Sequence, residues 1–301
     1  MYGAPPGMPQ TMPAPKRGRG PLLAIGLVVL LVILAGGGYV VGGFVYANGK
    51  INSATSTYNT VVDHQNKLTE FFNTWNKDVN ANDDPSKATA AALTQEKTLF
   101  GQLVTQSQAA QPQISTDDDA LAKADAGLRE NSWLTALSKS SLDKESNQIG
   151  YARAALAIAR TILADSIQYG TFWQALDQAN IDGDALDKAI TASDANAIVS
   201  ALSQLKSDVS KAIGLDTAPG LPTDMDGYLK TLQSLANDVS NLLAAAQSGD
   251  QTAFDNALNA IDSDSAKLSG YDFSGMLTKA ESFYSDLIDK YNAQVDLANK
   301  A

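Results

Sequence analysis

A long uncharged stretch runs from Gly20 to Gly49, near the N-terminus of this 301-residue chain. Its apolar part, Leu22 to Val45, is long enough to cross a hydrocarbon core of about 30 Å as a single helix, because an α-helix rises about 1.5 Å per residue. We therefore expect a transmembrane helix over residues 21–47.

The charged residues around this stretch indicate its orientation. Lys16, Arg17 and Arg19 precede it, and the first acidic residue of the chain is Asp63. Lys and Arg are enriched on the cytoplasmic side of membrane helices. Residues 1–20, rich in proline and glycine, are therefore expected to form a disordered cytoplasmic tail, and the rest of the chain an extracytoplasmic part.

The same stretch allows two further interpretations. Val45-Tyr46-Ala47 offers small residues at the spacing that signal peptidase reads. However, the apolar run is about twice as long as the 7–15 residues of a secretory signal, so we expect an uncleaved anchor. Gly38 and Gly42 form a small-xxx-small pair, which lets two membrane helices approach closely. This face is a candidate contact for a homodimer.

Charge and residue usage disfavour several classes of function. The part after the stretch carries 19 basic and 33 acidic residues, a net charge of -14, which disfavours binding to nucleic acid or to anionic headgroups. The chain has no cysteine and one histidine, His64, which we expect on a polar helix face. We therefore expect no metal, no cofactor and no enzymatic activity.

Apolar residues after the stretch recur at steps of three and four, the period of an α-helix, and no segment shows the sustained alternation of a strand. One apolar seam covers residues 51–79 and is interrupted only at Gln65. Pro112 is expected to end a second helix, and Thr116 with Asp119 resembles a capping pair that begins a third. The sequence therefore predicts an all-α protein.

The segment from Ile149 to Ile167 is apolar nearly all round, which is typical of a central helix. A second membrane crossing here is disfavoured, because Arg153, Arg160 and Asp165 would each be costly near the centre of a bilayer. We expect this helix to belong to an N-terminal helical bundle region over residues 48–169.

The C-terminal region contains an internal repeat. Residues 194–216 align without a gap with residues 250–272, an offset of 56 residues. In each copy an aspartate, Asp194 or Asp250, is expected to cap the second helix of a helical hairpin. Two hairpins and a closing helix would form a C-terminal helical bundle over residues 170–301.

Two groups of residues are candidate binding elements. Arg153 and Arg160 lie seven residues apart on one face of the most apolar helix, where they can clamp a carboxylate or phosphate ligand or pair with aspartates of neighbouring helices. Tyr169, Phe172 and Trp173 can line a ligand pocket, but aromatic residues at helical spacing more often belong to a core. Both alternatives stay open for each group.

Three aspartate-rich segments, residues 117–119, 180–184 and 223–227, invite comparison with calcium loops. When Gly183 or Gly227 is placed at the sixth position of an EF-hand loop, the twelfth position carries no carboxylate, which such a site requires. We interpret the three segments as helix caps and turns, with weak surface binding of cations as the alternative.

These features predict a membrane-anchored, extracytoplasmic helical module of the cell envelope, which binds or scaffolds a protein partner and has no catalytic activity of its own. The alternative is a sensory or regulatory subunit, whose exported bundle binds a ligand and acts through a membrane partner.

Overall fold

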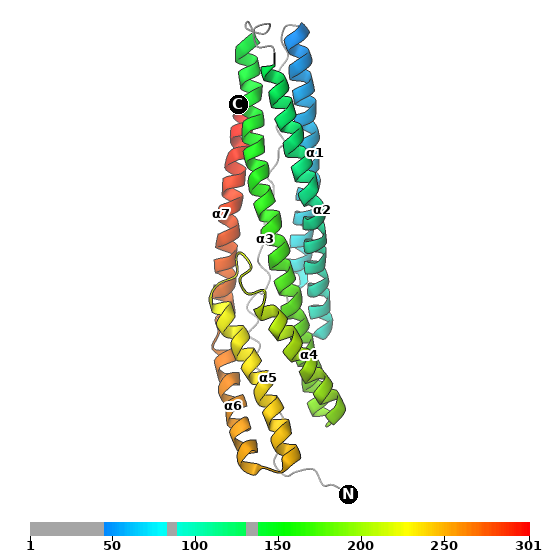
Figure 1. Cartoon of the computed structure of the whole chain (residues 1–301), viewed down its shortest axis with the longest axis vertical. Coiled ribbons are helices and arrows are strands. Elements are labelled where there is room, and N and C mark those ends of the chain that lie inside the picture. The colour runs from blue at the N-terminus through cyan, green and yellow to red at the C-terminus, as the bar shows by residue number, and fades with distance from the viewer. Residues whose placement is uncertain (1–44, 83–88, 131–137) are drawn as a thin grey trace. The chain divides into compact units, whose positions relative to one another are not determined.

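The computed structural model describes residues 45–82, 89–130 and 138–301, and throughout these residues the protein is helical, without a strand (Figure 1). The helices are α1 (Val45–Asn82), α2 (Ala90–Arg129), α3 (Lys139–Thr191), α4 (Ala195–Ile213), α5 (Asp224–Ser248), α6 (Gln251–Ser269) and α7 (Phe273–Lys300). The predicted all-α class is confirmed, and the helices pack as bundles.

Most of the predicted membrane region lies outside the described residues. This holds for the tail (1–20), for Gly38 and Gly42, and for the predicted transmembrane helix (21–47) except its last three residues, which begin α1. Within the part of the chain that the structure describes, no helix combines the length and the apolar character that a membrane crossing requires.

The described residues form two compact units, each built from segments that are distant in the sequence. Unit 1 contains the described residues within 82–101 and 169–279, and unit 2 contains residues 45–81, 102–168 and 280–301. The helices α2, α3 and α7 each contribute to both units. The division therefore falls inside these three helices and at the end of α1.

The predicted apolar seam of α1 is buried in the core of unit 2. Its buried members are Ala54, Tyr58, Val61, Phe72, Trp75 and Val79. Gln65, expected to interrupt the seam, is itself buried on the same face. The apolar segment of α3 adds Ile149, Leu156, Ile162 and Leu163, and burying each such side chain contributes about 1.5–3 kcal/mol.

The helix end predicted at Pro112 is wrong, because α2 continues through this residue and through Thr116, where a new helix was expected. A proline inside a helix removes one backbone donor. Even so, Leu103, Ile114 and Leu121 on the two sides of the proline are all buried. The Thr116 hydroxyl donates to the carbonyl oxygen of Pro112 at 3.0 Å. The burial of apolar side chains along both halves of α2 therefore outweighs the loss of one backbone hydrogen bond at Pro112.

The two repeat copies have the same local structure in unit 1. α4 and α6 each span 19 residues, and each follows an aspartate with extended backbone. The Asp194 carboxylate accepts from the backbone N–H groups of Asn196 and Ala197, and the Asp250 carboxylate accepts from that of Ala253. Both predicted N-caps are confirmed.

Four helices share one core in unit 1. Leu186 of α3, Leu205 of α4, Val239 of α5 and Ile261 of α6 belong to one buried apolar cluster. The predicted closing helix, α7, contributes only residues 273–279 to unit 1, and its remaining residues belong to unit 2.

The turn before each capping aspartate requires a left-handed residue, and the two copies meet this requirement differently. Ser193 has φ 54°, and its repeat equivalent, Gly249, has φ 71°. A residue with a Cβ atom pays about 1–2 kcal/mol in this conformation, whereas glycine pays almost nothing.

We expect Ser193→Gly to stabilise the protein by about 0.5–1 kcal/mol, because relief of this strain exceeds the added entropy of the unfolded chain. Thermal unfolding followed by circular dichroism measures the change. The matched control is Ser203→Gly at an exposed position inside α4, where the same substitution should lower the midpoint. A midpoint lowered by Ser193→Gly would contradict the assignment of strain to this turn.

Candidate functional site

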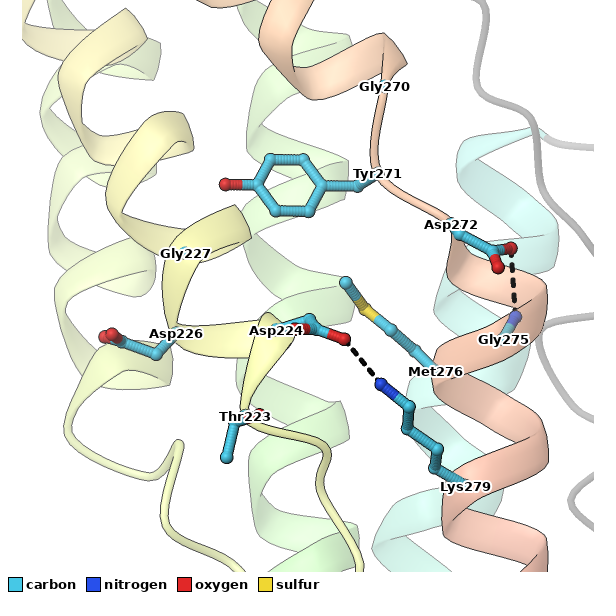
Figure 2. Close-up of a pocket in the computed structure, with 10 residues that line it drawn as sticks. All are labelled: Thr223, Asp224, Asp226, Gly227, Gly270, Tyr271, Asp272, Gly275, Met276 and Lys279. Atoms are coloured by element: carbon cyan, nitrogen blue, oxygen red, sulfur yellow. Dashed lines mark hydrogen bonds and ion pairs between the residues drawn. The ribbon is translucent and has the colours of Figure 1, made fainter.

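Unit 1 contains a cavity of about 560 Å³ between the beginning of α5 and the beginning of α7 (Figure 2). One side is formed by the first turn of α5, and the other by the connection from α6 to α7 and the first turns of α7. The lining residues are Thr223, Asp224, Asp226, Gly227, Gly270, Tyr271, Asp272, Gly275, Met276 and Lys279.

Tyr271 forms the wall of the cavity next to α5. Its ring packs edge to face on Tyr228, with centroids 5.7 Å apart, and its hydroxyl lies 3.2 Å from Thr231 Oγ1. A Cβ atom at position 227 would lie 2.9 Å from the Tyr271 hydroxyl oxygen. Glycine at position 227 therefore lets the tyrosine approach α5 closely.

Asp272 begins α7 on the other side of the cavity. Its Oδ1 accepts a hydrogen bond from the backbone N–H of Gly275 at 2.9 Å (Figure 2). A side chain at position 275 would collide with the Asp272 carboxylate, so this cap depends on glycine. The sequence predicted caps at Asp194 and Asp250, before the second helix of each hairpin, but not this one.

An ion pair spans the cavity. Lys279 Nζ of α7 donates to Asp224 Oδ2 of α5 at 2.7 Å (Figure 2). Both side chains are more than half exposed, and such pairs contribute about 0–1 kcal/mol to stability. Asp224 also lies in the first turn of α5, where the helix dipole favours negative charge.

Asp226 extends the acidic surface beyond the cavity. It pairs with Lys230 at 2.8 Å, and this hydrogen bond raises the pKa of Lys230. Burial, followed by the hydrogen bond and charge of Asp226, raises the pKa of Asp216. The lining residues include three carboxylates and one ammonium, so the complementary ligand is a cationic group with hydrogen-bond donors.

The two predicted clamp arginines lie in unit 2, next to an aspartate of α2. Arg153 Nε donates to Asp118 Oδ1 at 2.7 Å, and this hydrogen bond raises the pKa of Arg153. Arg160 Nη2 lies 3.9 Å from Asp118 Oδ2. An external anion would have to compete with Asp118 for both arginines, and the clamp stays a prediction.

The predicted aromatic group lies in unit 1, inside the packed interior. Tyr169, Phe172 and Trp173 are each at most 2% exposed. The Trp173 ring stacks on Phe100 of α2, with centroids 5.8 Å apart and an interplanar angle of 13°, and Phe172 meets Trp173 edge to face. These contacts are typical of core residues.

Two of the three aspartate-rich segments are not turns. Residues 117–119 lie inside α2 and residues 180–184 inside α3, and only residues 223–227 begin a helix, α5. Asp117 is buried and its Oδ1 lies 2.9 Å from Nδ1 of His64, which is partly exposed. Among the described residues, no group of three or more His, Cys, Asp or Glu side chains is placed to hold a metal ion.

Sequence reasoning missed the cavity, although it had marked both of its sides. Residues 223–227 were singled out as an aspartate-rich segment, and residues 270–272 close the second repeat copy. Periodicity cannot show that these two segments face each other, because this depends on how α5 and α6 pack.

Comparison of the chain with protein family models, with curated proteins and with solved structures yields no match. The residues and geometry described above therefore provide the basis for a functional proposal.

Proposed function

We propose that this protein is a membrane-anchored helical module of the cell envelope that binds or scaffolds a protein partner and has no catalytic activity of its own. The observation that carries the proposal is the uncharged stretch from Gly20 to Gly49, with three basic residues before it and no acidic residue before Asp63. A single N-terminal transmembrane helix over residues 21–47 holds the helical units outside the cytoplasm. The anchor forms a homodimer through Gly38 and Gly42 when two copies meet.

The cavity of unit 1 is the point at which such a module engages its partner. The carboxylates among the lining residues attract a basic side chain, which can replace Lys279 on Asp224 at little cost because the existing pair is exposed. The partner in the envelope is therefore expected to present lysine or arginine to the cavity. The net charge of the exported part favours the same kind of partner.

A crosslinking experiment in native membranes tests this binding role. The full chain, tagged at its C-terminus, is crosslinked and purified beside a variant carrying Asp224→Asn and Asp226→Asn. We expect the variant to lose at least about nine-tenths of the captured partner, since removing paired charges at an interface costs about 2–5 kcal/mol when they become buried.

The matched control carries Asp255→Asn and Asp262→Asn, which remove the same charge from exposed positions of α6. This control should capture the same partner as the unmodified chain. Equal capture by all three proteins would contradict a role for the cavity, and absence of any crosslinked partner would contradict the binding module itself.

The continuity of α3 supports the alternative, a sensory or regulatory subunit. This single helix runs from Lys139 to Thr191 and contributes to both units. A change of state in unit 1 can therefore be passed to unit 2 through a helix that belongs to both. This alternative requires a partner within the membrane or the cytoplasm, so the location of the crosslinked partner distinguishes the two functions.

A further inference from the structure

Helix α7 carries large side chains on two opposite faces. One face belongs to the core of unit 2 and includes Tyr284, Ile288 and Tyr291, which are at most 4% exposed. The other face carries Phe283 and Leu297, which are 39% and 41% exposed. These are two of the three exposed large apolar side chains in the part of the chain that the structure describes. Their presence on one face makes it a candidate interaction surface.

This face has the spacing of a coiled-coil seam. Positions 283, 290 and 297 are seven residues apart, and positions 286, 293 and 300 each follow one of them by three residues. Alternating steps of three and four residues place all six positions on one line along a helix. We call this line the outer seam of α7, and each of its side chains is exposed: Phe283, Asp286, Lys290, Ala293, Leu297 and Lys300.

The aromatic end of the outer seam is already ordered. The Phe283 ring packs edge to face on the buried Tyr284, with centroids 5.1 Å apart and an interplanar angle of 87°. A side chain that is held in place before binding loses little conformational freedom when a partner covers it. The exposed ring is therefore prepared for contact with another helix.

The charges of the outer seam favour a partner that carries both signs. Lys290 lies between the two apolar residues, and Asp286 and Asp289 precede it by four residues and one. All three charged side chains are exposed. In two parallel copies of α7, the lysine of each helix lies across from the acidic segment of the other. A second copy thus supplies both the apolar and the charged complement, whereas a purely basic helix would repel Lys290.

The relative direction of two such helices rests on the proposed membrane anchor. Chains anchored from the same side of one membrane are related by a rotation about the membrane normal. Helix α1 follows the predicted anchor, and α7 runs antiparallel to α1 in unit 2 (Figure 1). Helix α7 is therefore expected to lie along the normal, and a rotated copy beside it runs parallel.

We propose that the outer seam of α7 binds the outer seam of a second copy, as a parallel helix pair that joins two chains outside the cytoplasm. Phe283 and Leu297 of each copy pack on the same residues of the other, and each Lys290 pairs with Asp289 of the other copy. A lysine inside a seam lowers the affinity but fixes the register. A shift by seven residues would bury its ammonium against Phe283 or Leu297.

The pair is expected to depend on the membrane. Only two large apolar side chains per copy are available, so the seam is narrow beside the roughly 1,200–2,000 Å² that a stable soluble interface buries. Two anchors in one membrane raise the effective concentration of the helices. We therefore expect monomers in dilute detergent and dimers in membranes.

Cysteine crosslinking of the full chain in native membranes tests the proposal, because the natural chain contains no cysteine. Ala293→Cys places one thiol in the outer seam, where a parallel pair brings it next to its copy. We expect a disulfide-linked dimer after treatment with an oxidant. The matched control is Ser285→Cys, which is exposed on the same helix but away from the seam. It should give at least about tenfold less dimer, because a disulfide requires Cβ atoms about 4 Å apart.

A second variant tests the apolar contacts. Adding Phe283→Ser and Leu297→Ser to the Ala293→Cys chain should lower the crosslinked fraction at least about tenfold, because two apolar side chains are lost from each copy. Both positions are exposed, so the helix content measured by circular dichroism should stay the same.

Three results would overturn the inference. The first is equal crosslinking at positions 293 and 285, or no loss in the serine variant. The second is a crosslink between Phe283→Cys of one chain and Leu297→Cys of another, which would show an antiparallel pair. The third is a crosslink from Ala293→Cys to a different protein in place of the second copy. A membrane-bound chain that does not crosslink contradicts this inference alone, whereas recovery in the soluble fraction contradicts the proposed anchor.

Discussion

Trp173→Ala is expected to lower the free energy of unfolding of unit 1 by about 3–5 kcal/mol, the usual cost of emptying a large aromatic position in a core. The side chain is 2% exposed and lies against Phe100, Tyr169 and Phe172. Loss of the indole therefore leaves a cavity that these neighbours cannot fill. The midpoint of chemical denaturation, followed by circular dichroism, measures the loss.

The same variant decides between the two interpretations of the aromatic group. Val199→Ala, at the most exposed of the large apolar positions that the structure describes in α4, is the control and should change stability by less than about 0.5 kcal/mol. If the aromatic residues line a ligand pocket, Trp173→Ala would leave stability nearly unchanged, and that result would contradict the core assignment.

Tyr291→Ala is expected to destabilise unit 2 by a similar amount, about 3–5 kcal/mol, whereas Tyr291→Phe should be neutral or stabilise by up to about 1 kcal/mol. The ring is 1% exposed, and its hydroxyl oxygen is buried without a hydrogen-bond partner in the described structure. Burial, with a smaller effect of Tyr58, raises the pKa of this hydroxyl.

The phenylalanine variant separates the contribution of the ring from that of the hydroxyl. Removing a buried polar atom that has no partner relieves a desolvation cost, while the packing of the ring is preserved. Thermal unfolding of the two variants beside the unmodified chain measures both effects. A loss of more than about 1 kcal/mol in Tyr291→Phe would show that the hydroxyl has a partner, and would contradict this description of the core.

Periodicity was enough to predict the helices and much of the core. The seam over residues 51–79 is buried because a period of about 3.6 residues places these positions on one face. The caps at Asp194 and Asp250 were equally accessible to prediction, since an aspartate before a helix satisfies local N–H groups. Such features depend only on neighbours in the sequence.

The helix end predicted at Pro112 was wrong because the continuation of this helix depends on packing against other parts of the chain. The local cost of a proline is visible in the sequence, but the burial of Ile114 and Leu121 that offsets it is not. The division into two compact units is likewise not visible in the sequence. Because α2 and α3 each run through both units, no linker composition or proline-rich segment marks it.

The buried carboxyl groups were the largest omission of the sequence reasoning, which interpreted the aspartate-rich segments as helix caps and turns. Asp182 and Asp264 are buried, and each accepts a hydrogen bond from a residue of its own helix, Gln178 and Lys267 respectively. The repeat held one signal of these positions, since the offset of 56 residues places Asp182 on Asp238 and Asp208 on Asp264. The cavity beside Asp224 left no comparable signal, because its two sides come together only when α5 packs on α6.

Single-cysteine labelling of cells that express the full chain tests the membrane-anchored topology most directly, because the natural chain contains no cysteine. One variant carries Gln10→Cys in the predicted tail, and the other carries Asp262→Cys at an exposed position of α6. We expect a membrane-impermeant maleimide to label the Asp262→Cys variant in intact cells, and the Gln10→Cys variant only after permeabilisation. Labelling of the tail in intact cells while Asp262→Cys stays protected would contradict the topology, and recovery of the chain in the soluble fraction would contradict the anchor.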